Sequence, residues 1–286
     1  MIALFGNLKV YKTRIKNALS RSGLPDIDYA LNPYIGCSHG CIYCYARLYT
    51  RHKEVSENWG EVVIVKENIV EVLKEEVTRL PRGTVGVSTI TDPYQPIETF
   101  YKLTRSSIKV LLEHGFRVSI QTKNPLVLRD VDLLSKYADR VDVGFTITTL
   151  EDSIASFIEP KAPPPRARSE ALAKISGHGI KTWIFYGPII PGLNDDDETI
   201  DGLLALAKET GSTVYYDRLH VKPFMNDNSL APYLIKLRRY DWRQFLEKLL
   251  KRCRTAGVEC RPGLDYEDVH RKIDDYLSRD GYANDK

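Results

Sequence analysis

Three cysteines of the chain fall within a stretch of eight residues. Cys37, Cys41 and Cys44 stand in the run Asn32-Pro-Tyr-Ile-Gly-Cys-Ser-His-Gly-Cys-Ile-Tyr-Cys-Tyr-Ala-Arg47, with the spacing C-x3-C-x2-C. Three thiolates on a four-iron cluster leave one iron without a protein ligand, and that iron is free to bind a substrate or cofactor. The spacing therefore predicts an open metal cluster that takes part in chemistry.

Two other interpretations of these thiols stay open at this point. Zinc accepts two thiolates spaced C-x2-C, but structural zinc sites use four tetrahedral protein ligands, with about 2.3 Å to each sulfur. The further ligands would then come from His39, Cys253 or Cys260. A structural role as a disulfide is less favoured, because three clustered thiols cannot all pair and no secretory segment indicates an oxidising compartment.

The residues around the cysteines make the metal prediction more specific. Gly36 and Gly40 flank the first thiolate and allow the backbone to approach an inorganic cluster closely. The stretch resembles the radical S-adenosylmethionine (SAM) superfamily, whose hallmark is C-x3-C-x2-C with an aromatic residue before the third cysteine, here Tyr43. More narrowly, it resembles the branch of spore photoproduct lyase through the groups Asn32-Pro-Tyr, Gly36-Cys, His39-Gly-Cys and Tyr43-Cys-Tyr-Ala.

The resemblance implies a particular chemistry. Cys37, Cys41 and Cys44 would hold a [4Fe-4S] cluster, and the reduced cluster would cleave SAM to methionine and a 5′-deoxyadenosyl radical that abstracts hydrogen from an unknown substrate. An electron donor such as ferredoxin or flavodoxin would supply the electron. The protein itself would supply positioning, electrostatics and exclusion of water.

Length and composition agree with one enzyme domain. The chain has 286 residues, of which 43% are hydrophobic, enough to bury one large core. Its net charge of +3, from 28% charged residues of both signs, indicates neither nucleic acid nor membrane as a partner. No apolar run reaches the ~20 residues of a membrane span, and the N-terminus lacks the apolar core of a signal peptide. We therefore expect a cytoplasmic enzyme.

Strand and helix patterns alternate along the chain. The sequence predicts strands near 62–65, 85–88, 116–121, 141–148, 181–186 and 213–220. It predicts helices near 69–80, 99–114, 127–138, 168–177, 198–210 and 231–256. With one more strand before Cys37, this order indicates a parallel sheet flanked by helices.

The resemblance implies that this sheet forms the partial (β/α)6 TIM-like barrel of radical SAM enzymes. An open doubly wound sheet shares the same pattern and stays open as an alternative. We expect a single radical SAM domain over 1–286, with a core barrel at 27–222, an N-terminal extension at 1–26 and a C-terminal helical extension at 229–286. In such a barrel the loops that follow the strands form the site.

Polar residues at the strand ends suit a zwitterionic cofactor such as SAM. Lys123 follows a predicted strand and matches the lysine that reaches the cofactor carboxylate in the lyase branch. Many members carry a Gly-Gly-Glu motif for the amino group; it is absent here, so the resemblance assigns that role only loosely, to Ser88, Asp92 and Glu98. We expect further SAM contacts from Tyr43, Thr146, Thr148, Arg168 and the segment 184–194. As surface or turn residues, the same side chains would bind no ligand.

The substrate is less well indicated. Tyr45 matches a tyrosine proposed to relay hydrogen in the lyase branch, and it is the catalytic candidate. The hydrogen-donating cysteine of the lyase aligns near Thr89, which is not a cysteine, so thymine-dimer repair is not implied. Cys253 and Cys260 are more simply interpreted as core or structural positions.

The predicted C-terminal helix is rich in basic residues. It carries Lys236, Arg238, Arg239, Arg243, Lys248, Lys251, Arg252 and Arg254, with Tyr233, Tyr240 and Trp242 among them. This pattern suits phosphate contact with base stacking, or the solvated face of an amphipathic helix. Two alternatives to the general radical SAM function therefore stay open: a DNA or RNA lesion repair or modification enzyme, and a non-catalytic zinc or iron-sulfur binding module.

Overall fold

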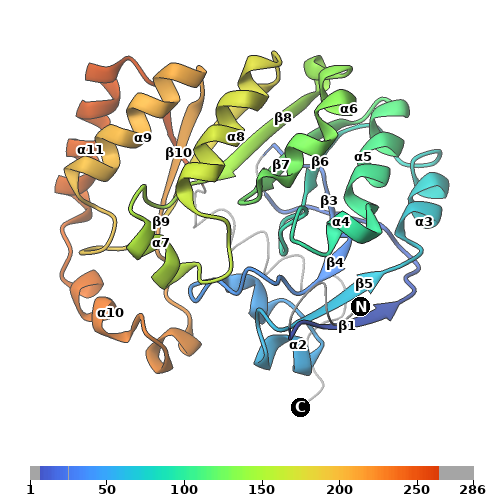
Figure 1. The fold of residues 1–286 in the computed structure, drawn as a ribbon, viewed down its shortest axis with the longest axis horizontal. Coiled ribbons are helices and arrows are strands. Elements are labelled where there is room, and N and C mark those ends of the chain that lie inside the picture. Colours follow the sequence, from blue (N-terminus) through green and yellow to red (C-terminus); the bar gives the residue numbers. More distant parts are fainter. Residues whose placement is uncertain (1–6, 25, 264–286) are drawn as a thin grey trace.

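A single large sheet organises the molecule. The computed structural model describes residues 7–24 and 26–263, and its main sheet has the strand order β11-β10-β9-β8-β7-β6-β3-β2 (Figure 1). The strands are β2 (Leu19–Arg21), β3 (Tyr29–Leu31), β6 (Thr84–Val87), β7 (Arg117–Thr122), β8 (Val141–Thr146), β9 (Lys181–Ile189), β10 (Thr213–Arg218) and β11 (Cys260–Pro262). All neighbours are parallel except the β2–β3 pair.

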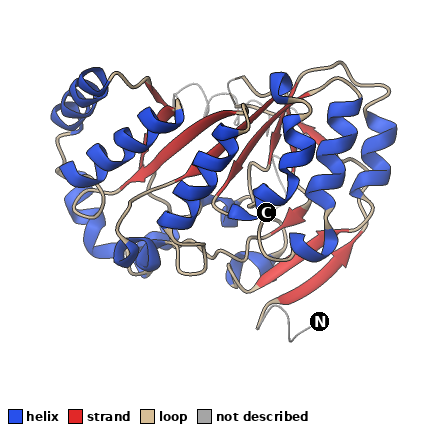
Figure 2. Cartoon of the chain, turned by 45° about the horizontal axis from the view of Figure 1, so that its top comes forward, coloured by secondary structure: helices blue, strands red, loops and turns tan. Residues whose placement is uncertain are grey.

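Helices cover one face of this sheet (Figures 1 and 2). The α-helices are α2 (Lys53–Glu57), α3 (Ile69–Glu76), α4 (Glu98–Tyr101), α5 (Leu103–Glu113), α6 (Val131–Ser135), α7 (Asp152–Ile158), α8 (Pro165–Gly177), α9 (Asp197–Thr210), α10 (Ala231–Arg238) and α11 (Trp242–Ala256). Short 3-10 helices are η1 (Tyr45–Leu48), η2 (Pro125–Asp130), η3 (Ala138–Arg140) and η4 (Pro223–Asp227). Helices α5, α8 and α9 pack directly on the strands.

The two faces of the sheet differ because side chains alternate along each strand. In β7, Val118 and Ile120 are fully buried and join the core under the helices, whereas Ser119 and Gln121 point to the opposite face and stay partly exposed. The helix-free face is therefore the polar one.

The sheet does not close on itself. Among the described strands, β2 and β11 are the two edges, and six parallel strands (β3, β6, β7, β8, β9 and β10) are each followed by loops at their carboxyl ends. The expected partial barrel is confirmed in this open form.

The strand predicted at 62–65 exists but lies elsewhere. It is β5 (Val62–Lys66), which pairs with β1 (Lys9–Thr13) and β4 (Tyr34–Ile35) in a separate three-stranded sheet. Alternation alone does not reveal which sheet a strand joins, because pairing partners are distant in sequence.

Three predicted helices are interrupted, and two helices, α2 and α7, were not predicted. The helix expected at 99–114 breaks at Lys102, whose φ is 51°, because the Glu98 carboxylate accepts the Thr104 amide and starts α5 afresh. The helix expected at 231–256 is two helices, α10 and α11, since Asp241 caps a new start by accepting the Gln244 amide. The helix expected at 127–138 is a short α6 between η2 and η3, and α7 was missed.

Both ends of the described chain join the core sheets. Residues of the predicted N-terminal extension form β1 and β2, and the C-terminal extension contributes α10, α11 and β11, with residues 264–286 outside the described part. Cys253 and Cys260 form a disulfide that ties α11 to β11. No helix in the described ranges combines the length and apolarity of a membrane span. The domain boundaries stay a prediction.

Candidate active site

The three clustered cysteines lie in a tight loop between β4 and η1, here called the cluster loop (residues 36–44). Cys37 and Cys41 are buried, Cys44 is partly buried, and all three are free thiols. Gly36 and Gly40 have φ values of 86° and 62°, a conformation that favours glycine. At Gly36 a β-carbon would lie 2.5 Å from the Val62 carbonyl oxygen, so the turn requires glycine there.

Hydrogen bonds from other loops hold the cluster loop in place. Gln95 is fully buried; its amide accepts the backbone N–H of Ser38 at 2.9 Å and donates to the Gly36 carbonyl at 3.2 Å. On the other side, Asn228 donates to the Ile42 carbonyl at 2.9 Å. Residues that follow β6 and β10 thus fix the backbone that carries the thiols.

Burial governs the protonation of the three thiols. Burial raises the pKa of Cys41 to about 12 and also raises the pKa values of Cys37 and Cys44. Metal loading would therefore displace protons from these thiols. Within residues 7–24 and 26–263, no three His, Cys, Asp or Glu side chains converge as ligands of one metal ion.

A buried charge cluster lies beside the cluster loop. We name Tyr43, Lys123, Glu159 and Arg168 the Glu159 network. Glu159 pairs with Arg168, accepts the Tyr43 hydroxyl and lies 3.8 Å from the Lys123 ammonium. Burial alone would raise the pKa of Glu159, but Arg168 and Lys123 outweigh it and hold that pKa below its usual range. One carboxylate thus faces two cations.

Lys123 and Arg168 differ in how far their charge is already used. Arg168 is 1% exposed and also donates to the carbonyls of Pro163 and Thr146, so it fixes the end of β8. The Lys123 side chain is 16% exposed, and its ammonium lies 5.7 Å from the Tyr43 ring centroid. Burial lowers the pKa of Lys123, but Cys41 and Glu159 outweigh that effect, and the pKa is raised. Lys123 is therefore the more exposed of the two cations beside Glu159.

The Asp92 carboxylate accepts hydrogen bonds from residues of the neighbouring loops. It accepts the Tyr94 amide at 2.9 Å, the Thr122 hydroxyl at 2.7 Å and the Lys123 amide at 2.8 Å. The same carboxylate lies 3.4 Å from Nδ1 of His39, whose pKa is lowered by burial. Asp92 therefore joins the loop after β7 to the cluster loop.

Several buried polar atoms around the cluster loop have no hydrogen-bond partner among the described residues. They are the hydroxyls of Ser38, Ser88 and Thr148, Nε2 of His39 and Nη2 of Arg168. Buried polar groups are nearly always paired, so such a concentration indicates a missing ligand. Thr146 differs, because its hydroxyl accepts from Gln121 at 3.0 Å.

Residues that sequence analysis underrated also shape the site. Asn194 is fully buried; it donates to the Thr148 carbonyl and accepts the Ile190 amide, which folds the segment after β9 against β8. Glu159 was not among the predicted site residues, and its pairing with Pro160 in the sequence was the available signal. Tyr45 is 44% exposed and donates to the Thr89 carbonyl at 2.8 Å, at the rim of the site.

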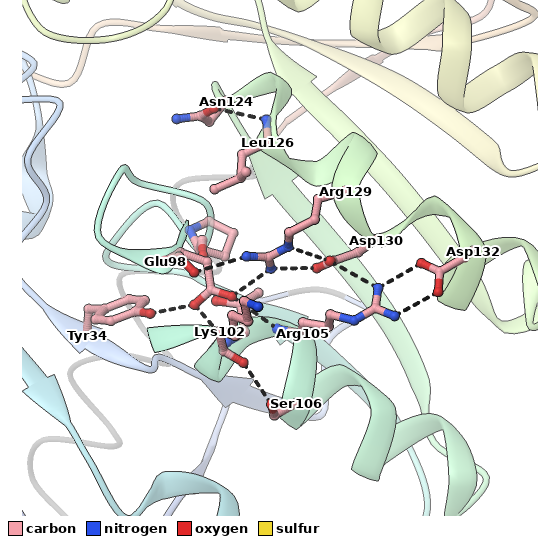
Figure 3. A network of polar contacts seen from close by, with 12 residues as sticks. Tyr34, Glu98, Lys102, Arg105, Ser106, Asn124, Leu126, Arg129, Asp130 and Asp132 are labelled. Carbon is pink, nitrogen blue, oxygen red and sulfur yellow. Dashed lines mark hydrogen bonds and ion pairs between the residues drawn. The ribbon is translucent and has the colours of Figure 1, made fainter. Parts of the chain in front are cut away.

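A second buried charge cluster lies under the loop after β6 (Figure 3). We name Tyr34, Glu98, Arg105, Arg129, Asp130 and Asp132 the Glu98 network. Glu98 is fully buried; it accepts from Tyr34, from the Thr104 amide and from Arg129 at 2.8 Å. Arg129 also bonds Asp130, and Arg105 joins Asp130 to Asp132. Glu98, loosely considered for SAM, is thus committed to this network.

The basic residues of α10 and α11 are partly neutralised. Arg252 pairs with Asp197 and Asp201, Lys248 pairs with Asp197, and Arg243 pairs with Glu247. These ion pairs, all of them with basic residues of α11, are typical of the solvated face of an amphipathic helix, and nucleic-acid binding stays a prediction.

Known proteins resemble this chain in sequence. The profile described as "Radical SAM superfamily" matches residues 31–207. An uncharacterised protein of Methanocaldococcus jannaschii is 30% identical over 257 residues, covering 88% of this chain and 95% of that protein. A Pseudomonas phage M6 protein named radical SAM Nalpha-GlyT isomerase is 24% identical over 172 residues, covering 58% of this chain and 34% of the phage protein.

Solved structures share the fold. Spore photoproduct lyase complexed with dinucleoside spore photoproduct has a TM-score of 0.61 and 18% identity, over 76% of this chain and 64% of the lyase, less than two thirds of its length. A radical SAM methyltransferase from Sphaerobacter thermophilus has a TM-score of 0.54 and 17% identity, over 85% and 67% of the two chains. Profile, relatives and cluster-loop geometry agree, and the chain is an enzyme that belongs to the radical SAM superfamily.

Proposed function

We propose that Cys37, Cys41 and Cys44 hold a [4Fe-4S] cluster and that the strand ends beside them bind SAM. When bound, the cluster and SAM supply a one-electron carbon-sulfur cleavage whose 5′-deoxyadenosyl radical takes hydrogen from a substrate. The buried cluster loop would exclude water and oxygen from this chemistry. A one-electron donor such as ferredoxin or flavodoxin would be the protein partner.

The observation that carries the proposal is the set of unpaired polar atoms around the cluster loop. Ser88 and Thr148, whose hydroxyls are unpaired among the described residues, follow the carboxyl ends of β6 and β8, which are separated in the sheet only by β7. A ligand that bonds both would span the mouth of the partial barrel beside the thiols. SAM offers hydroxyls, an amino group and a carboxylate for such contacts.

The Glu159 network would orient the cofactor. Its two cations exceed its one carboxylate, so an incoming carboxylate completes the charge balance at Lys123. Arg168 and Asp92 would act as positioning residues, because their polar atoms already hold β8 and the loop after β7. Tyr43 would pack against the Lys123 ammonium. Thr146 and Tyr45 would line the approach to the 5′ carbon of SAM.

Anaerobic reconstitution with iron and sulfide tests the cluster. The wild-type protein is expected to gain broad absorbance near about 400 nm, and Cys41→Ala is expected to lose it. Cys253→Ala is the matched control, since it removes a cysteine of the α11–β11 disulfide and leaves the cluster loop intact. Equal absorbance in wild type and Cys41→Ala would refute cluster binding by these thiols.

Cleavage of SAM tests the second half of the proposal. Reconstituted, dithionite-reduced protein should form 5′-deoxyadenosine slowly without substrate. Lys123→Met should weaken SAM binding by about tenfold or more, because it removes a charge-assisted bond worth ~1.5–3 kcal/mol. Lys208→Met, on α9, is the control. No 5′-deoxyadenosine from fully loaded wild type would contradict the proposed activity.

A further inference from the structure

A separate cavity opens at one edge of the main sheet, on its helix-free face. It has a volume of about 370 Å³ and lies where β2 and β3 meet the end of β5. This volume is near the lower end of the range of about 300–1,000 Å³ for small-molecule sites. Its lining is Asn17, Ala18, Leu19, Ser20, Arg21, Ala30, Asn32 and Lys66.

The side chains that line this cavity include positive charges and amides but no negative charge. Lys66 and Arg21 contribute positive charge, Asn17 and Asn32 contribute amides, and none of the lining residues is acidic. The Arg21 guanidinium stacks over the Tyr29 ring at 4.9 Å, at the rim. No carboxylate in the described ranges forms an ion pair with Lys66, and burial lowers the pKa of its ammonium. The cavity is therefore a half-buried cationic site that lacks an anion.

Hydrogen bonds fix the chain segment that forms one wall of the cavity. The Asn68 side chain bonds both the amide and the carbonyl of Ile15, and the Glu76 carboxylate accepts the amides of Ala18 and Leu19. Both Glu76 oxygens are thereby used by the backbone. Fixed walls reduce the entropy lost on binding.

The cavity is connected to the candidate active site through one residue. Asn32 lines it, and the carbonyl oxygen of the Asn32 side chain accepts the amides of Thr89 and Ile90 after β6. The amide nitrogen of Asn32 donates to the Thr89 hydroxyl at 3.3 Å, which leaves one N–H for a ligand. The Thr89 carbonyl in turn accepts the hydroxyl of Tyr45. The cavity lining and the rim of the candidate active site are thus joined by hydrogen bonds through Asn32 and Thr89.

We infer that this cavity binds an oxyanion carried by the substrate, with Lys66 as the charged contact and Asn17 and Asn32 as amide donors. The inference rests on the proposed function, because it makes the cavity a substrate subsite of that enzyme. The substrate class is then a molecule bearing a phosphate or a carboxylate. The anion anchors it while its reactive carbon lies toward the cluster loop.

Calorimetric titration of the full-length protein with inorganic phosphate and with acetate tests the inference. Wild type should bind at least one of them saturably, phosphate more tightly for a phosphate-bearing substrate and acetate for a carboxylate. Lys66→Gln should weaken binding at least tenfold, Lys66→Arg should retain it, and Lys16→Gln should leave it unchanged. If Lys66→Gln does not fold, Asn17→Asp places a negative charge at the rim and should weaken binding equally.

Two outcomes overturn the anion site: wild type binds neither anion, or Lys66→Gln binds as wild type does. SAM cleavage by reconstituted wild type is measured separately on the same preparation. Absent cleavage with intact anion binding refutes the proposed function, whereas intact cleavage without anion binding refutes this inference alone.

Discussion

The Glu98 and Glu159 networks both bury charge beneath the same mouth of the sheet, yet they are completed differently. The Glu98 network sets three carboxylates against two guanidiniums, and the buried oxygens of Glu98 and Asp130 are bonded within the protein. The Glu159 network sets one carboxylate against two cations and leaves Nη2 of Arg168 unpaired among the described residues. The first network is closed within the protein, and the second is not.

The difference teaches that burial of charge does not by itself mark a functional site. A closed network specifies local structure: here it breaks a helix at Lys102 and holds Tyr34 at the start of the cluster loop. An incomplete network next to unpaired hydroxyls indicates what the site must still bind. The comparison can be tested through stability for the closed network and through ligand binding for the open one.

The largest effect is expected from Arg129→Met. It leaves Glu98 and Asp130 as buried carboxylates with reduced compensation, which typically costs ~3–5 kcal/mol of unfolding free energy. Urea denaturation of the metal-free protein measures the loss. Arg166→Met is the matched control, because its pair with Glu170 is exposed on α8 and should change stability by less than about 1 kcal/mol. Equal losses in both variants would contradict a structural role for the Glu98 network.

The next effect is the stabilisation of the reconstituted protein by SAM. Ligand at about 100 times its Kd should raise the unfolding free energy by ~2.7 kcal/mol. At a fixed SAM concentration the thermal shift should shrink in Lys123→Met, which alters the open network, and persist in Arg105→Met, which alters the closed one. A shift that Arg105→Met removes and Lys123→Met leaves intact would reverse our assignment of the two networks.

A smaller effect should follow from deleting one unpaired hydroxyl. Thr148→Val keeps the side-chain shape, so stability should hold, while SAM affinity should fall by about 5–10-fold, or ~1–1.4 kcal/mol. Ser107→Ala is the control, because its hydroxyl is also buried and unpaired among the described residues but lies within α5. Equilibrium dialysis of reconstituted protein gives both affinities. Unchanged SAM affinity in Thr148→Val would remove this hydroxyl from the binding site.

The smallest effect concerns pH at the exposed end of the Glu98 network. Hydrogen bonds from Arg105 lower the pKa of Asp132 from 3.8 to about 2. A depressed carboxyl pKa stabilises the fold above pH 3.8, and this contribution disappears as pH falls through about 2. The stability difference between wild type and Asp132→Asn should therefore shrink over that window in denaturation at stepped pH. A constant difference would show that the pair does not couple to protonation.

Much of the fold could be predicted from local sequence patterns, and the errors in that prediction share one cause. Strand and helix positions were mostly right because alternation and helical spacing are local properties. The breaks at Lys102 and Asp241 were missed because side-chain acceptors, and for Glu98 a distant network, start new helices there. The strand at 62–65 was found, but its separate sheet was not, since pairing depends on partners far along the chain.

By itself, the sequence determined the cluster loop: cysteine spacing and flanking glycines are local, and the family resemblance rests on them. It also nominated Lys123 and Thr148 as strand-end residues. Only the tertiary structure decided that Lys123 is the more exposed of the two cations that pair with Glu159, and that Lys66 lines a cavity without an acidic lining residue. The physical reason is that desolvation and charge pairing depend on neighbours that the fold brings together from distant segments, and residue type alone does not encode them.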